Sequence, residues 1–185
     1  MPGDMFTEVD PFSQVFQALW DLAEASTTIM SLTKPGNRIK FSSLDSTSRD
    51  PVKTAVQDGD LPELILTSVG SQDMNMHSDS CSTRLMRRFD WLLSTGEYRI
   101  TYRLYPVQWA LFAAMQDYPS VLLPLTWNGA QFVKKMRWGS LSEGLSNAAL
   151  NRGIKGWTSL LSVEIDMWFA KNDLRTFNAG PQEGP

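Results

Sequence analysis

Alternating apolar and polar positions dominate the end of the chain, from Trp157 to Phe169. One set of alternate positions is apolar apart from a serine, and the other set is mostly polar. Successive side chains of a strand point to opposite faces, so the pattern predicts one strand over residues 157–169 with a buried and a solvated face. At about 3.3 Å per residue this strand spans roughly 40 Å. A small core does not need that length, and a sheet shared between subunits is one structure that could use it.

Helical spacing of apolar residues marks two other segments. The first begins at Asp10-Pro11, because Asp is a good N-cap and Pro is favoured at the first helical position. Its apolar positions predict an amphipathic helix to about residue 30. The second helix is expected to begin after Pro106 and to cover residues 107–117. It is apolar nearly all round, which is typical of a helix that is buried or covered by a partner.

Shorter apolar segments predict further strands, and polar segments separate them. Residues 70–82 and 120–130 are expected to be irregular. Residues 98–103 fit either a strand or a helix, and the pattern leaves both open. The predicted strands cover residues 38–41, 64–69, 83–93 and 132–138. A connection over residues 139–156, rich in Ser, Asn and Gly, links the last of these to the long strand.

This order of elements predicts an α+β fold, a mostly antiparallel sheet of about four main strands with two helices packed on one face. The length of 185 residues suits a single domain, here residues 1–169. Residues 42–60 hold few apolar side chains and are expected to form an exposed loop. Residues 170–185 are expected to form a flexible C-terminal tail.

Charge and composition narrow the classes of function. The formal net charge is −3, so no global attraction to DNA or to an anionic membrane is expected. Cys81 is the single cysteine and can make no internal disulfide, which favours a reducing cytosol as the site of assembly. Neither a signal peptide nor a run of about 18 apolar residues is visible, so no membrane association is expected. The seven Trp residues fill the core or serve interfaces, where Trp is enriched.

Candidate catalytic and metal-binding groups are sparse. The best metal candidate is Asp73, His77, Asp79 and Cys81, but its spacing matches no zinc pattern and the chain holds no second His or Cys. We interpret this segment as a polar loop. No G-x-S-x-G elbow accompanies His77, and neither glycine-rich nucleotide motif occurs. The sequence therefore indicates no catalytic residue, no metal and no cofactor, and the protein is not expected to be an enzyme.

Charged side chains form small groups on the predicted strands. Glu164 and Asp166 share one face of the long strand, where a solvated face explains them better than acid–base catalysis. Two basic clusters could form one phosphate-binding stripe with Trp91 or Trp138 as stacking partners. The interpretation that we favour is that they are solvated, or ion-paired with a neighbouring subunit. The clusters are Arg84, Arg87 and Arg88, and Lys134, Lys135 and Arg137.

Several features taken together resemble the tail terminator (tail completion) proteins of tailed bacteriophages, over roughly residues 10–169. A short N-terminal helix leads through a loop into a Pro-led strand, and a polar stretch precedes the strand from Leu85 to Leu93. The loop over residues 37–60 and the polar tail extend beyond the compact family pattern. The segments that carry the resemblance are Leu61-Pro-Glu-Leu-Ile-Leu66, Leu93-Ser-Thr-Gly-Glu-Tyr-Arg-Ile100, Tyr105-Pro-Val-Gln-Trp-Ala-Leu111, Gly139-Ser-Leu-Ser-Glu-Gly144 and Arg152-Gly-Ile-Lys-Gly-Trp157.

The resemblance implies a non-enzymatic virion protein that forms a hexameric ring on the end of the tail tube. Such a ring ends tube polymerisation and docks the tail to the neck or head–tail connector. It implies as partners further copies of the chain, the tail tube protein and a neck or connector protein, with sheath protein as a further candidate. It also implies that genomic DNA passes through the lumen without specific binding and that assembly takes place in the host cytoplasm.

The expected contacts between subunits or with partners involve exposed aromatic and charged side chains. Trp168, on the polar face of the long strand, and the connection over residues 139–156 are the first candidates. Two other functions stay open: another neck or tail component, and a nucleic-acid-binding α+β module that uses the two basic clusters. The candidate interface residues are Arg87, Trp109, Lys135, Arg137, Trp138, Glu143, Trp157 and Trp168.

Overall fold

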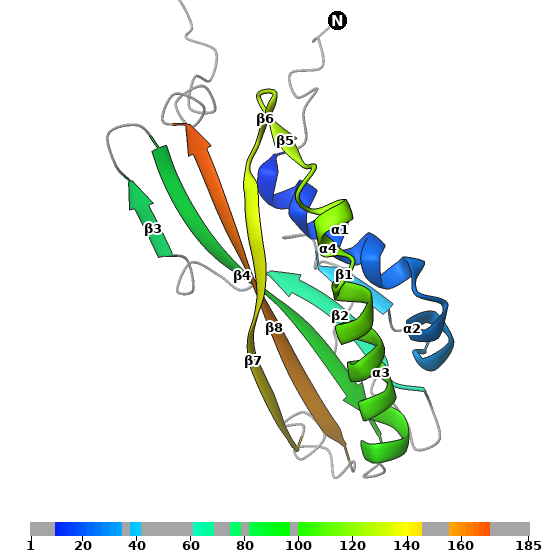
Figure 1. The fold of residues 1–185 in the computed structure, drawn as a ribbon. Helices are drawn as coiled ribbons and strands as arrows, with labels where there is room; N and C mark the ends of the chain where they lie inside the picture. Colours follow the sequence, from blue (N-terminus) through cyan, green and yellow to red (C-terminus); the bar gives the residue numbers. More distant parts are fainter. Residues whose placement is uncertain are drawn as a thin grey trace, which may run out of the picture.

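A twisted sheet runs the length of the molecule and carries a layer of helices on one face (Figure 1). The computed structural model describes residues 10–34, 38–41, 61–68, 75–78, 82–96, 100–145 and 156–170. The main sheet has the strand order β1-β2-β4-β8-β7, and β3 pairs with β4 beside β2. All neighbours are antiparallel except β1 and β2. Its strands are β1 Arg38–Phe41, β2 Glu63–Ser68, β3 Asn75–Ser78, β4 Ser82–Thr95, β7 Val133–Leu145 and β8 Trp157–Ala170.

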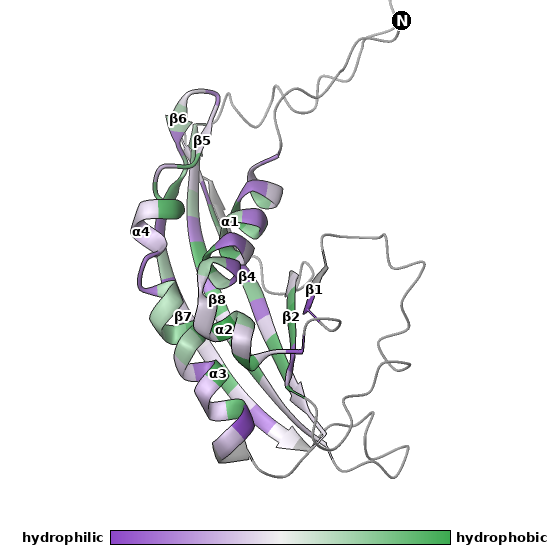
Figure 2. Cartoon of the chain, turned by 90° about the vertical axis from the view of Figure 1, so that its right-hand side faces the viewer, coloured by the Kyte–Doolittle hydropathy of each residue, from purple (hydrophilic) through white to green (hydrophobic). Residues whose placement is uncertain are grey.

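The helices cover one face of this sheet and leave the other face bare of helices in the described part of the chain, as Figure 2 shows with the helix layer in front. A two-stranded hairpin, β5 and β6, lies beyond the helices. The architecture confirms the predicted α+β fold with a mostly antiparallel sheet and helices on one face. The elements are α1 Pro11–Ala25, α2 Thr27–Leu32, α3 Ile100–Met115, α4 Tyr118–Val121, β5 Thr126–Trp127 and β6 Ala130–Gln131.

The central pair, β4 and β8, is antiparallel and is in register from Ser82 opposite Ala170 to Thr95 opposite Trp157. The long strand predicted at the end of the chain is therefore confirmed. The alternate positions of β8 that the sequence assigned to the core are buried against the helices, because period-2 alternation places them on one face. These buried residues are Ser159, Leu161, Val163, Ile165, Met167 and Phe169.

The first predicted helix is two helices in the structure. Asp10 caps α1 as expected, and its carboxylate accepts hydrogen bonds from the backbone N–H groups of Phe12 and Ser13 at 3.0 Å each. At Ser26 the backbone is extended, and the serine hydroxyl accepts from the N–H of Ile29 at 3.3 Å. Serine competes with the helix by such local bonds, so it ends α1 and caps α2, and the prediction of one helix to residue 30 was wrong here.

The second predicted helix begins earlier than the sequence indicated. Helix α3 starts at Ile100 and contains Pro106. Residues 100–103, for which the sequence left both a strand and a helix open, are therefore helical. Proline in a helix interior costs about 3 kcal/mol. Burial of Leu104, Val107 and Leu111, all fully buried at helical spacing, outweighs that cost.

Three strand predictions also change. Strand β7 does not end at residue 138 but continues to Leu145, so residues 139–145 of the predicted connection are strand. Strand β3 lies within residues 70–82, where an irregular segment was expected. The β5–β6 hairpin turns at Asn128 (φ 50°) and Gly129 (φ 76°), both of which tolerate the left-handed conformation that a tight hairpin requires. The expected loop over residues 42–60 and the expected tail beyond Ala170 lie outside the described residues.

One carboxyl group in the sheet is buried at high cost. Glu63, at the start of β2, is only 7 % exposed, and its Oε1 finds no hydrogen-bond partner among the described residues. Burial raises the pKa of Glu63 to about 7, although the charge of Lys34 and a hydrogen bond from Ser94 act in the opposite direction. The folded protein therefore holds this carboxyl neutral over a range in which the unfolded chain ionises it.

We predict that Glu63 makes folding stability fall as the pH rises. Its stabilising effect is complete below about pH 4.5 and is lost by about pH 7, because the unfolded state releases the proton first. Glu63→Gln removes this dependence, and at pH 8 the variant should be more stable than the wild type by on the order of 2 kcal/mol. Urea unfolding at pH 4.5 and pH 8 measures the difference. An equal difference at both pH values would contradict the prediction.

Candidate functional site

The bare face of the sheet, called here the outer sheet face, is formed by alternate residues of β4, β7 and β8. Strand β7 carries a bulge between Val133 and Lys135, where two residues oppose one residue of β8. Val133 and Met136 are buried in the core, while Lys134 and Lys135 are both exposed. The bulge therefore directs two consecutive lysines away from the core, which a regular strand cannot do.

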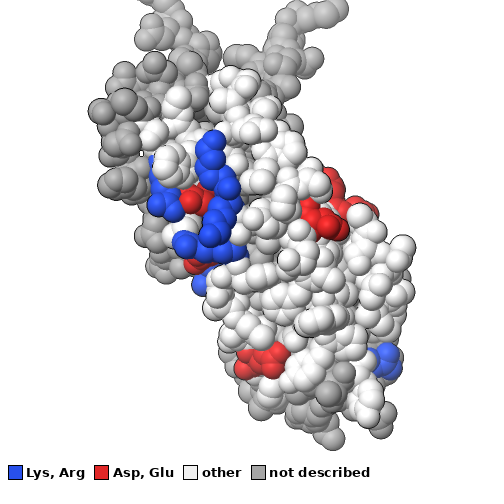
Figure 3. All heavy atoms as spheres, viewed as in Figure 1, with Lys and Arg blue, Asp and Glu red and all other residues white. Residues whose placement is uncertain are grey.

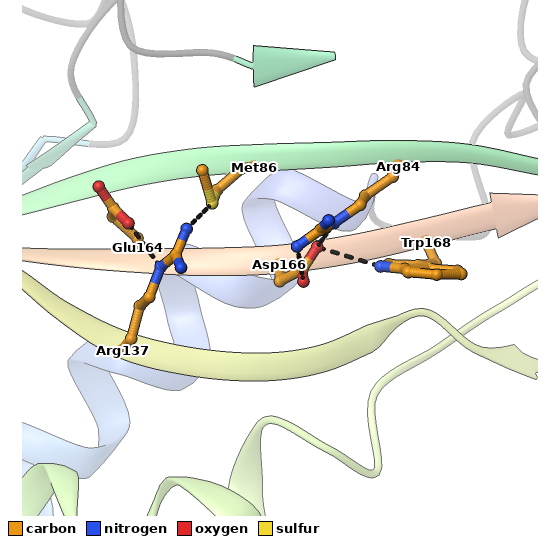
Figure 4. Close-up of polar contacts among 6 residues, drawn as sticks. All are labelled: Arg84, Met86, Arg137, Glu164, Asp166 and Trp168. Carbon is orange, nitrogen blue, oxygen red and sulfur yellow. Dashed lines mark hydrogen bonds and ion pairs between the residues drawn. The ribbon is translucent and has the colours of Figure 1, made fainter. Parts of the chain in front are cut away.

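Ion pairs cross the strands of the outer sheet face (Figure 4). Arg84 on β4 binds both carboxylate oxygens of Asp166 on β8, at 2.8 and 2.7 Å. Arg137 on β7 donates to Glu164 at 2.7 Å and also contacts the sulfur of Met86. The hydrogen bonds and charge of Asp166 raise the pKa of Arg84. Such exposed pairs contribute little to stability, typically below about 1 kcal/mol each, but they fix where the charges sit.

Trp168 extends this network toward the end of β8. Its indole N–H donates to Asp166 at 3.1 Å, and the guanidinium of Arg84 lies 5.7 Å from the centre of its ring. The side chain is nevertheless 43 % exposed. The ring is thus held in place with much of its surface open to a partner.

A shallow depression of about 480 Å³ lies beside this network. It sits at a second bulge of β7, between Trp138 and Leu141, and the hydroxyls of Ser140 and Ser162 lie 3.2 Å apart in it. The arginines that line it are both ion-paired, Arg88 with Asp90 at 2.8 Å and Arg137 as above. Among the described residues no group of His, Cys, Asp or Glu could hold a metal ion. The described residues that line the depression include no activated nucleophile.

The opposite side of the molecule presents an aromatic stripe on α3. Tyr102, Tyr105 and Trp109 follow one face of the helix and are 80 %, 43 % and 76 % exposed. Leu141 on β7, on the strand side that faces α3, is 53 % exposed. The sequence indicated a helix that is buried or covered by a partner, and the described chain covers only its inner face. Contiguous exposed apolar surface of this kind marks interaction sites.

A polar contact fixes α3 on the sheet. The amide nitrogen of Gln108, a buried residue, donates to the carboxylate of Glu143 on β7 at 2.5 Å and to the hydroxyl of Ser159 on β8 at 2.6 Å. Nearby, the rings of Phe112 and Trp138 pack edge to face with centres 4.3 Å apart. These contacts hold the aromatic stripe in a fixed orientation relative to the strands.

Acidic side chains border the helix layer. Asp21 and Glu24 on α1 and Asp117 before α4 are exposed. Figure 3 shows Asp and Glu atoms over the region of α1 and α4, well separated from the Lys and Arg atoms that gather along β7. The two sides of the molecule therefore differ in charge.

The predicted interface residues fall into three groups. Lys135, Arg137 and Trp168 lie on the outer sheet face, and Trp109 lies in the aromatic stripe. Trp138 and Glu143 contact α3 from the sheet, on the side of the helix away from the aromatic stripe. Trp157, at the start of β8, is half-buried, and its indole N–H is buried with no partner among the described residues.

Arg87 lies on the other side of the sheet from its basic neighbours. It is half-buried beneath α1, with its guanidinium 4.1 Å from the ring centre of Phe12 and 5.7 Å from that of Phe89. Burial lowers the pKa of Arg87, while the charge of Asp10 raises it. The cluster of arginines near residue 87 is therefore divided between two faces, as alternation in a strand requires.

Sequence reasoning missed Tyr102, Tyr105 and Leu141. The first two stand seven and four positions before Trp109, which is the spacing of one helix face, but the expectation that Pro106 starts the helix concealed it. Leu141 was assigned to the connection over residues 139–156, whereas it lies on β7. Of the metal candidates, His77 lies on β3, and Asp73, Asp79 and Cys81 lie outside the described residues.

Comparison with known proteins finds no matching family model and no matching curated protein. Among solved structures, one similar chain belongs to the virion of a native gene transfer agent (GTA) particle. The two share 13 % sequence identity with a TM-score of 0.47, over 88 % of this chain and 100 % of that chain. A likeness of this degree supports no functional conclusion. None of the helices described is long and apolar enough to cross a membrane.

We predict that Gln108→Leu destabilises the protein by about 1–3 kcal/mol, because it leaves the buried hydroxyl of Ser159 and the carboxylate of Glu143 without their donor. Gln116→Leu, at an exposed position of the same chain segment, is the matched control and should change stability by less than about 0.5 kcal/mol. Urea unfolding midpoints measure both. Equal effects of the two substitutions would show that the buried amide contributes nothing specific.

Proposed function

We propose that the protein is a non-enzymatic structural subunit of a phage-like virion that closes into a ring at the end of the tail tube. This is the role of the tail terminator proteins that its sequence resembles. The observation that carries the proposal is the aromatic stripe of α3, which a monomer would expose to water. In this role the ring ends tube growth and presents its other side to the neck or connector.

The stripe has the composition of an interface centre. Tyr and Trp dominate the residues that contribute most to protein–protein binding, and they do so when water is excluded around them. Fully burying one large apolar side chain contributes about 1.5–3 kcal/mol. Three such side chains on a helix held firmly by Gln108 supply a rigid contact that needs little ordering on binding.

The long strands suit the proposed ring. Each subunit of a ring uses two different surfaces that fit one another, and the rotation between copies closes the assembly. The long β4–β8 pair gives each subunit a rigid scaffold, and the two surfaces used in the ring would lie on opposite sides of it. The chain as a whole is negative at −3, so DNA that passes such a ring would meet weak phosphate contacts.

The alternative function, a nucleic-acid-binding module, finds less support. Its basic clusters would have to form one cationic stripe, yet Arg84, Arg88 and Arg137 each pair with a carboxylate and Arg87 lies beneath α1. We therefore expect no salt-sensitive DNA affinity that charge reversal at Lys135 abolishes. Electrophoretic mobility shift with duplex DNA at two salt concentrations tests this alternative.

We predict that the purified protein limits the growth of tail tubes. Tail tube protein from the same virion, polymerised with and without this protein, is compared by electron microscopy. Capped tubes should be shorter and should carry a ring of density at one end. Light scattering over a range of concentrations, with and without tube protein, gives the number of copies in the ring. Tubes of unchanged length with bare ends would refute the proposal.

We predict that Trp109→Ser weakens subunit association by roughly tenfold to a hundredfold, because it removes the largest aromatic side chain of the stripe. Its stability should stay within about 0.5 kcal/mol of the wild type, since the side chain is 76 % exposed. Thr126→Ala, exposed on β5, is the control and should leave both quantities unchanged. Association unaffected by Trp109→Ser would remove the stripe from the interface.

A further inference from the structure

Two surfaces of the chain are complementary in charge and chemistry. The first, called the helix face, consists of Tyr102, Tyr105 and Trp109 on α3 together with the exposed carboxylates of Asp21, Glu24 and Asp117. Helices α1, α2 and α4 contain no Lys or Arg, and α3 contains only Arg103. This face is therefore acidic and aromatic.

The second surface is the outer sheet face. On β4, β7 and β8 it carries the cations of Arg84, Arg88, Lys134, Lys135 and Arg137 against the carboxylates of Asp90, Glu164 and Asp166. Each of the three arginines pairs with one of the carboxylates, so the two lysines of the β7 bulge supply the excess positive charge. The chain as a whole is negative at −3, so this face opposes the overall charge.

The chemistry of the two faces matches group by group. Carboxylates attract the lysines, and the rings of Tyr and Trp attract cations that lie over them. The two groups also extend over comparable lengths. The stripe from Tyr102 to Trp109 is about 10 Å long at 1.5 Å per helical residue, and Lys135 and Arg137 stand roughly 7 Å apart along β7.

The alternative pairings are unfavourable. A two-fold contact between two helix faces would bring the carboxylates of both copies together. A two-fold contact between two outer sheet faces would bring the two lysines of one copy against the two lysines of the other. Like charges brought together at an interface cost several kcal/mol. A contact between unlike faces avoids this cost and can repeat from copy to copy.

We infer that the helix face of one copy docks on the outer sheet face of the next copy. This inference rests on the proposed ring and adds to it the two surfaces that form its subunit contact. It gives Trp168, fixed by Asp166 but 43 % exposed, a place within the contact. It also gives a role to the bulge that directs two lysines of β7 outward. Without a partner at those lysines, the bulge would only interrupt the hydrogen bonding between β7 and β8.

Charge reversal on each face tests the inference. The sheet-face variant carries Lys134→Glu and Lys135→Glu, and the helix-face variant carries Asp21→Lys, Glu24→Lys and Asp117→Lys. Light scattering and sedimentation measure the mass of each variant alone, of the two mixed, and of a chain that carries all five substitutions. Each single-face variant should associate roughly a hundredfold more weakly than the wild type. The mixture and the five-substitution chain should both recover assembly, because each then presents opposite charges at every contact.

Control measurements distinguish a variant that fails to fold from a variant that folds but fails to assemble. Circular dichroism and thermal melting establish that each variant is folded, which is expected because all five positions are exposed. Raising the salt concentration should weaken the wild-type assembly and narrow the difference between variants. If the wild type assembles and both single-face variants assemble equally well, or if assembly lost in each is not recovered in combination, this inference is wrong while the ring stands. A wild type that stays monomeric with and without tube protein would refute both.

Discussion

The antiparallel pairing of β4 with β8 is the interaction on which the rest of the structure depends. It aligns the two longest strands over their whole length, from Ser82 opposite Ala170 to Thr95 opposite Trp157. Strands β2 and β3 add to one side of the pair and β7 to the other, and the helices pack on the face that it buries. Because side chains alternate across a strand, this single register decides which residues enter the core and which stand on the outer sheet face.

The two bulges of the edge strand β7 determine which of its side chains lie on the outer sheet face. Two bulges interrupt its pairing with β8, and each places an additional residue on the outer sheet face. One bulge exposes the two lysines and the other opens the depression around Ser140 and Ser162. A bulged, lysine-bearing edge also resists uncontrolled pairing with other strands. In the proposed assembly, association is thereby directed to side-chain surfaces rather than to the open edge.

Helix α3 connects the core with the proposed interface. Its inner face buries Leu104, Val107 and Leu111, and Gln108 ties it to both β7 and β8. Its outer face carries aromatic side chains that no described part of the chain covers. Because the inner face is fixed by packing and hydrogen bonds, the outer face is presented rigidly. Rigid aromatic surfaces bind with a small loss of conformational entropy, which is the physical basis for assigning this helix to an assembly contact.

The sequence by itself determined the elements whose signals are local. The alternation of apolar and polar residues predicted the buried and exposed faces of β8, and Asp10-Pro11 predicted the start of α1. The order of the elements predicted the α+β layers. Tertiary structure decided the rest, because there local preference and long-range contact disagree. Pro106 and the Gly/Ser-rich run after Trp138 are locally unfavourable for a helix and a strand, yet burial against the sheet and pairing with β8 outweigh that preference. The aromatic stripe depends on the helix that continues through Pro106, and the outward lysines depend on the bulge between Val133 and Lys135. The sequence therefore named Trp109, Lys135, Arg137 and Trp168 as candidates, but only the folded chain shows which surfaces they share.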